Sequence, residues 1–244
     1  MKVALISDIH ANLPALEVVL AHAREAGVDA IWNMGDSVGY GPFPDEVVRL
    51  LRKEDIRSIL GDFDHKVLRF KKRKDKLRKT EVREKYLAYQ WAYDNLSKKS
   101  NKYLRFLSKE MRIKVKGRRV LLTHVSPGGG KKPVEIEGPE GVLQALAQEA
   151  KADVIVLGHT HQSALRKVSG AWYINPGSVG RQSDGDPRAS YARLDITSDD
   201  LHVTHFRLEY DIDSVVAALR KEGLPKAFAQ MFSQGRDLET VLKG

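Results

Sequence analysis

The run Lys2-Val3-Ala4-Leu5-Ile6-Ser7-Asp8-Ile9-His10-Ala11-Asn12 opens the chain with apolar residues that give way to polar ones. The near-continuous apolar stretch over 2–7 predicts a strand covered on both faces, because a half-exposed strand would alternate. Pro14 and the apolar residues after it predict a helix that extends to Gly27, and residues 30–34 predict a second strand. A strand, a helix and a strand within about 30 residues make a βαβ unit, so this region favours an α/β fold.

A second βαβ unit follows the first. Residues 45–51 predict its helix and residues 56–60 its strand, and two such units in succession predict a largely parallel sheet with helices on its face. Later in the chain, the strands are expected to form hairpins. The predicted strands span 112–115, 120–123, 154–157, 164–168, 172–174, 191–196 and 201–208, and the predicted helices span 139–150, 212–221 and 225–232. We therefore expect one domain over 1–244, an α-β-β-α sandwich of two packed sheets flanked by helices.

Residues 66–109 interrupt this order with a helical, basic insertion. Helical spacing predicts a helix over 81–96, whose Tyr86, Tyr89 and Tyr93 should form a packed face rather than a base-stacking platform, and a shorter one over 102–107. The stretch Lys66 to Lys79 holds nine basic residues and one acid, and the whole chain has a net charge of +9. The basic charge therefore belongs to one element, which is either a solvated, partly disordered surface helix or loop or an element that recruits phosphates.

Composition excludes several kinds of chemistry. The chain has no cysteine, so it holds no thiolate nucleophile, zinc finger, iron–sulfur cluster or disulfide. Any metal must be bound by His, Asp, Glu or Asn. No apolar run approaches the roughly 18 residues that span a bilayer, so we expect a cytoplasmic protein with no membrane partner.

Side chains able to bind a metal follow the predicted buried strands. They are Asp8, His10, Asp36, Asp62, His124, His159 and His161. Because ligands bind at the carboxyl ends of the strands in α/β sheets, we expect these residues to converge. Burying so many ionisable groups without a cation would be costly. Mixed oxygen and nitrogen ligands are enough for two divalent ions that share one carboxylate, and they suit Mn, Fe, Zn, Co or Ni better than Ca or Mg.

Six motifs together resemble those of the calcineurin-like metallophosphoesterases, in the family's order and over nearly the whole chain. They are Ser7-Asp8-Ile9-His10-Ala11-Asn12, Gly35-Asp36-Ser37-Val38-Gly39-Tyr40-Gly41-Pro42, Gly61-Asp62-Phe63-Asp64, Thr123-His124, Gly158-His159-Thr160-His161 and Asn175-Pro176-Gly177-Ser178-Val179-Gly180. The chain is most similar to the small bacterial and archaeal branch that includes phosphodiesterases and diadenosine-tetraphosphatase-like proteins. The resemblance implies a two-sheet sandwich with a dinuclear centre. Its ligands would be Asp8, His10 and His161 for one metal and Asp62, His124 and His159 for the other, with Asp36 as the bridge.

Two residues depart from the family's pattern, which usually reads Gly-Asn-His-Asp at positions 61–64. The Asn that binds the second metal is Asp62 here, and the His commonly proposed to protonate the leaving group is Phe63. Asp62 is either a ligand or an ordinary turn residue that leaves the second metal weak or absent. Phe63 cannot transfer a proton, so His65 is the candidate replacement, with a plain surface role as the alternative. Asn12 either reaches the phosphate site or caps the following helix.

These features predict a metal-dependent phosphodiesterase or phosphatase for a small, nucleotide-like phosphorylated substrate. A hydroxide held between two metals would attack the phosphate ester or anhydride. The loss of a proton donor predicts a preference for acidic leaving groups, as in anhydrides or aryl diesters. Two alternatives remain open. One is a nuclease whose Lys66 to Lys79 stretch binds nucleic acid, and the other is a weakly active metal-binding nucleic-acid or regulatory module.

Overall fold

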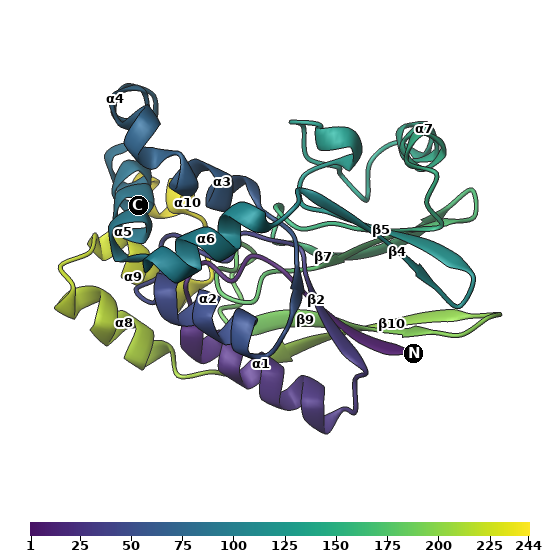
Figure 1. Ribbon diagram of the computed structural model, residues 1–244. Helices are drawn as coiled ribbons and strands as arrows, with labels where there is room; N and C mark the ends of the chain where they lie inside the picture. Colours follow the sequence, from purple (N-terminus) through teal and green to yellow (C-terminus); the bar gives the residue numbers. More distant parts are fainter.

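Two five-stranded sheets stack face to face in the computed structural model, which describes all 244 residues (Figure 1). The first sheet has the order β10 (Leu201–Leu208), β9 (Ala189–Ile196), β1 (Lys2–Ile6), β2 (Ala30–Asn33) and β3 (Arg57–Ser58). The second has the order β4 (Glu110–Val115), β5 (Arg118–Thr123), β6 (Val154–Val156), β8 (Ala171–Pro176) and β7 (Ser163–Val168). The predicted α/β sandwich is therefore confirmed, while the extent of the domain, 1–244, stays a prediction.

Alternation along β1 shows why the sheets stack. Val3 and Leu5 point into the core between the sheets, where they join residues of β5 and β6. Ala4 and Ile6 point the other way, against α1 (Leu13–Glu25). The central strands of the second sheet are covered in the same way by α7 (Glu140–Ala150), so helices form the outer layers (Figure 1).

The first sheet is mixed, which corrects the prediction of a largely parallel one. Its strands β1, β2 and β3 are parallel. The hairpin of β9 and β10 then adds to the free edge of β1, and β9 runs antiparallel to it. The spacing of βαβ units could not reveal that a hairpin from the far end of the chain would complete this sheet.

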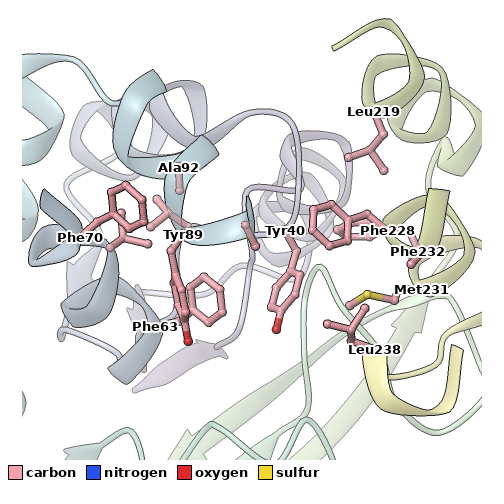
Figure 2. Packing of buried hydrophobic residues seen from close by; sticks show 14 of the residues in the cluster. Tyr40, Phe63, Phe70, Tyr89, Ala92, Leu219, Phe228, Met231, Phe232 and Leu238 are labelled. Carbon is pink, nitrogen blue, oxygen red and sulfur yellow. The ribbon is translucent and has the colours of Figure 1, made fainter. Parts of the chain in front are cut away.

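The helices other than α1 and α7 form a lobe at one end of the sheets (Figure 1). These helices are α2 (Pro44–Lys53), α3 (Asp62–Leu68), α4 (Phe70–Thr80), α5 (Arg83–Asn95), α6 (Lys98–Phe106), α8 (Ile212–Lys221), α9 (Lys226–Gln234) and α10 (Leu238–Lys243). One apolar cluster joins the insertion to the C-terminal helices, and Tyr40 and Phe63 lie in its middle, between Tyr89 of α5 and Phe228 of α9 (Figure 2). No helix of the fold has the length and apolar character needed to span a bilayer.

The basic stretch is helical over nearly its whole length, in agreement with the predicted helical insertion. Phe70 and Leu77 lie seven residues apart on α4 and are both buried in the apolar cluster. Phe70 contacts Tyr86 and Tyr93 of α5, with ring centroids 5.4 and 5.7 Å apart. Two anchors are enough to hold a helix whose remaining side chains are almost all charged and exposed. The tyrosines of α5 therefore form a packed face, as predicted.

Candidate metal centre

All seven predicted ligands meet at one edge of the two sheets, and most of them have an unusual backbone. Five of the seven adopt a left-handed conformation: Asp8 (φ 54°), His10 (φ 48°), Asp36 (φ 50°), His159 (φ 69°) and His161 (φ 62°). Each residue in this conformation lowers the stability of the fold by about 1–3 kcal/mol, and the conformation persists only where the surrounding structure holds it. Here the N–H groups of Asp8 and His10 donate to the carbonyls of Gly35 and Asp36, both at 3.0 Å.

A first ligand group consists of Asp8, His10 and His161, all of which are buried. The Nε2 atom of His161 lies 3.2 Å from Asp8 Oδ1 and 3.3 Å from His10 Nε2. The Nε2 atom of His10 lies 3.9 Å from the same Asp8 oxygen. Three ligand atoms therefore converge on a space that is closed to solvent.

A second ligand group consists of Asp62, His124 and His159 and is partly open. Asp62 Oδ1 lies 2.9 Å from His159 Nδ1 and 3.4 Å from His124 Nε2. The side chains of Asp62 and His159 are each 30% exposed. Asp62 is the first residue of α3, and its role as a metal ligand stays a prediction.

Asp36 lies between the two groups. Its Oδ2 atom is 3.2 Å from His124 Nε2 and 4.0 Å from His10 Nε2. Its Oδ1 atom accepts a hydrogen bond of 2.7 Å from the backbone N–H of Phe63. Gly61 is required here because a Cβ at this position would lie 2.0 Å from Asp36 Oδ1. The close approach of the chain at Gly61, rather than a left-handed turn, explains the glycine before Asp62.

Outer contacts orient the ligands. His124 Nδ1 lies 2.8 Å from the carbonyl of Met34, and His161 Nδ1 contacts the carbonyl of Arg181. Both histidines therefore turn Nε2 toward the centre, as is typical of metal-binding imidazoles. Asp8 Oδ2 accepts hydrogen bonds from Ser7 Oγ at 2.6 Å and from the backbone N–H of His159 at 3.0 Å, which leaves Oδ1 facing the ligands.

The electrostatics of the centre fit bound cations. Asp8 Oδ1 and His124 Nε2 are buried polar atoms without a hydrogen bond, although such atoms are nearly always paired. Burial would raise the pKa of the Asp8 carboxyl, but nearby His161, His124 and His10 hold it below its usual value. Burial and the neighbouring Arg181 lower the pKa of His10. Burial would lower the pKa of His124, but the carboxylates of Asp36 and Asp62 hold it well above its usual value. Ionised Asp8 and neutral His10 are therefore already in the forms that bind metals, whereas a metal at His124 would displace a proton.

Asn12 is placed at the start of α1, close to the centre. Its Oδ1 accepts a hydrogen bond from Ala15 N at 3.2 Å, and its Nδ2 donates to the carbonyl of Gly180 at 2.9 Å. The residue is completely buried. These contacts favour the helix-capping role, and contact of Asn12 with substrate stays a prediction.

His65 and Phe63 share α3 but lie in different surroundings. Burial and the charges of Lys109 and Arg69 lower the pKa of His65, which favours a neutral ring. Phe63 is buried, with its ring centroid 4.3 Å from that of Tyr89 and 4.8 Å from that of Tyr40. Phe63 is therefore a packing residue next to the centre.

Arg181 is a residue that the sequence did not single out. Its guanidinium lies over the ring of Tyr40, 4.7 Å from the centroid, and its Nη2 is 3.4 Å from His161 Nε2. Its Nε is buried without a hydrogen bond, and no acid forms an ion pair with it. The only local signal is that Arg181 directly follows the Gly177 to Gly180 motif. The contact with Tyr40 joins two distant parts of the chain.

Comparison with known proteins agrees with this geometry. Residues 1–199 match the family model of the calcineurin-like phosphoesterase superfamily domain. The chain belongs to this superfamily. A metallophosphoesterase of known structure, from Sphaerobacter thermophilus, is 31% identical, with a TM-score of 0.75 and coverage of 96% of this chain and 99% of that one. The protein is therefore a metal-dependent phosphoesterase.

Two further relatives of this calcineurin-like phosphoesterase are similar over most of their length. An uncharacterized protein of Methanocaldococcus jannaschii is 31% identical over 251 residues, which cover 96% of this chain and 98% of that protein. The phosphodiesterase YfcE of Escherichia coli strain K12 is 29% identical over 195 residues, which cover 80% of this chain and 88% of that protein.

Proposed function

We propose that the protein is a dinuclear-metal-dependent hydrolase of phosphate esters or anhydrides, a phosphodiesterase or phosphatase for nucleotide-like substrates. The observation that carries the proposal is the position of Asp36 between two complete ligand groups. One metal would be held by Asp8, His10 and His161, the other by Asp62, His124 and His159, with Asp36 as the bridge. Mn, Fe, Zn, Co and Ni suit these ligands. The similarity to a phosphodiesterase supports the substrate class.

Metals bound in this way would lower the pKa of a water molecule and neutralise charge on the phosphoryl oxygens. The residues of the chain add the binding of the phosphate itself. Arg181 has no acid partner and lies beside His161, so its guanidinium is free to donate two hydrogen bonds to phosphoryl oxygens. Tyr40 holds it in place by stacking.

The leaving group has to depart without help from residue 63, because Phe63 has no proton to give. Arg181 would balance the charge on the leaving oxygen instead. Leaving groups that are stable as anions, such as phosphates and aryl oxides, should therefore be preferred over alkyl oxides. His65 is proposed as a catalytic residue that supplies a proton where the leaving group needs one.

The proposal is tested by metal analysis together with a phosphate-release screen over nucleotides, dinucleoside polyphosphates and phosphodiesters. We expect up to two transition metals per chain and hydrolysis that chelation abolishes. Full activity in metal-stripped protein, or a maximum of one bound metal at saturation, would contradict a dinuclear enzyme.

A nuclease is the second candidate, because the charged side chains of α4 are exposed. Binding of DNA or RNA through this helix should weaken steeply with salt, with a log–log slope of about 0.9 per phosphate contacted in duplex DNA and about 0.7 in single strands. Replacing Lys71, Lys72, Arg73 and Lys74 together should flatten that slope. Absence of binding at low salt would remove this candidate.

A further inference from the structure

A cavity of ≈ 430 Å³ extends outward from the second ligand group. Asp62, His124 and His159 lie among its lining residues. Most of the remaining lining comes from α3 and α4, from the start of β4 and the residue before it, and from the glycine-rich loop after β5, residues 127–130. We infer that this cavity binds the further phosphates of a short phosphate chain whose reacting phosphorus lies at the metal centre. The inference rests on the proposed function.

Positive charge from three separate segments lines the cavity. Lys66 and Arg73 belong to α3 and α4, Lys109 precedes β4, and Lys131 follows the glycine-rich loop. Lys66 pairs with Asp62, with Nζ 2.9 Å from Oδ2. The other three form no ion pair, although Glu110 also lines the cavity. A single phosphate bound at the metals would leave these cations unused, whereas a chain of phosphates would meet them.

The lining favours phosphate over a nucleobase. None of its 16 residues is Phe, Tyr or Trp, and bases in single-stranded nucleic acid are usually held by stacking on such rings. The nearby aromatic residues of the insertion, such as Phe70 and Tyr89, are buried in the apolar cluster. The cavity therefore suits the phosphate chain itself, whether inorganic or carried by a nucleotide whose base lies outside.

The helix α4 provides a matched control. Among its seven basic residues only Arg73 lines the cavity. Lys72 and Lys76 are exposed on the same helix and lie outside the lining. The double variants R73E/K109E and K72E/K76E change the net charge by the same amount, so they separate contact inside the cavity from the general field of the helix.

Calorimetric titration of the metal-loaded protein with methylenediphosphonate and with orthophosphate tests the inference, with bound metal measured before and after. Methylenediphosphonate keeps two phosphorus groups and resists hydrolysis. We expect it to bind wild type about tenfold tighter than orthophosphate, the gain typical of added charged hydrogen bonds. R73E/K109E should bring this ratio close to one, the milder R73A/K109A should lower it by several-fold, and K72E/K76E should leave it unchanged.

Two results would overturn the inference. One is a ratio near one in the wild-type protein. The other is an equal loss in K72E/K76E, because the gain would then come from the general field of α4 and not from contact inside the cavity. Binding of β,γ-methylene-ATP, compared with binding of methylenediphosphonate over a salt series up to a tenth molar, distinguishes the two sources of the phosphate chain. Tighter binding of the nucleotide indicates a nucleoside polyphosphate, and equal binding indicates an inorganic phosphate chain. Hydrolysis of a small chromogenic diester by wild type tests the proposed function separately, since it needs no second phosphate.

Discussion

The two ligand groups use similar side chains but differ in their access to solvent. In the first, Asp8 is 0% and His161 3% exposed, because the loop of Gly177 to Gly180 bonds to the end of β1 and Arg181 stacks over Tyr40. In the second, Asp62 and His159 face the cavity and are each 30% exposed. Under the proposed two-metal arrangement, this difference predicts two tasks: we expect the first group to hold its metal more firmly and the second to admit substrate beside its own.

Asp36 is the residue whose loss should erase this difference, because it lies between both groups. Asp36→Asn keeps an acceptor for the Phe63 N–H but removes the charge. We expect both metals to be lost and activity to fall by more than about 100-fold, since changes in outer-shell partners alone cost 10–100-fold. Elemental analysis of the purified variant checks this, and retention of one full equivalent of metal would show that the groups are independent.

Chelation should sharpen the comparison by removing the metals in order. The more exposed second group should release its metal first, and the buried first group should release its metal more slowly. Metal release followed over time should therefore show two phases. His159→Ala should remove the fast phase, and His161→Ala should remove the slow phase. Loss of the slowly released metal of the first group should lower the melting temperature more than loss of the other metal. A single phase in wild type would mean that the two sites exchange together.

Phe63→His tests whether the packing beside the centre can accept the family's usual residue. The ring of Phe63 is buried between Tyr40 and Tyr89, so an imidazole there should lower the free energy of unfolding by about 3 kcal/mol, near the cost of truncating a buried Phe. Where it folds, the variant should speed hydrolysis of alkyl esters more than of aryl esters. Denaturant unfolding measures the loss of stability, and rates with matched alkyl and aryl esters measure the effect on hydrolysis. Equal gains for both esters would contradict the interpretation that residue 63 lacks a proton donor for the leaving group.

Asp62→Asn should change the second group by a smaller amount. Removing one negative charge raises the net charge of the metal-loaded centre by one, so phosphate and vanadate should inhibit several-fold more strongly. The second metal should also be held less tightly. Inhibition constants measured at saturating metal separate the two effects, and unchanged inhibition would show that Asp62 is not a ligand.

His65→Ala is expected to have the smallest effect on substrates with acidic leaving groups, less than about threefold, because they need no proton donor. For alkyl esters a loss of 10²–10⁴-fold would identify His65 as the proton donor. Lys72→Ala, at an exposed position of α4 outside the cavity, serves as the control. No loss with either substrate would leave His65 with a surface role.

The sequence was most informative where local pattern and topology coincide. Candidate ligands directly follow β1, β2, β5 and β6, and the ends of these strands meet at one edge of the sheets. The sequence pattern alone therefore predicts that these ligands converge. The stacking of Arg181 on Tyr40 could not be predicted from the sequence, because it joins residues 141 positions apart and no local pattern marks it. The insertion was predicted to be helical, but the way α4 is anchored by Phe70 and Leu77 was not, since its charges indicate a solvated element.

The left-handed backbone at five of the ligands has an evolutionary consequence. At Asp8, His10, Asp36, His159 and His161, glycine would fit the local backbone better than the residue present. With the proposed ligand roles, catalysis and thermodynamic stability would select for different residues at the same positions. In a descendant freed from selection for hydrolysis, these five positions should drift toward glycine sooner than Asp62 and His124, whose backbones are ordinary. Such a pattern would mark the loss of enzymatic activity in a lineage whose fold persists.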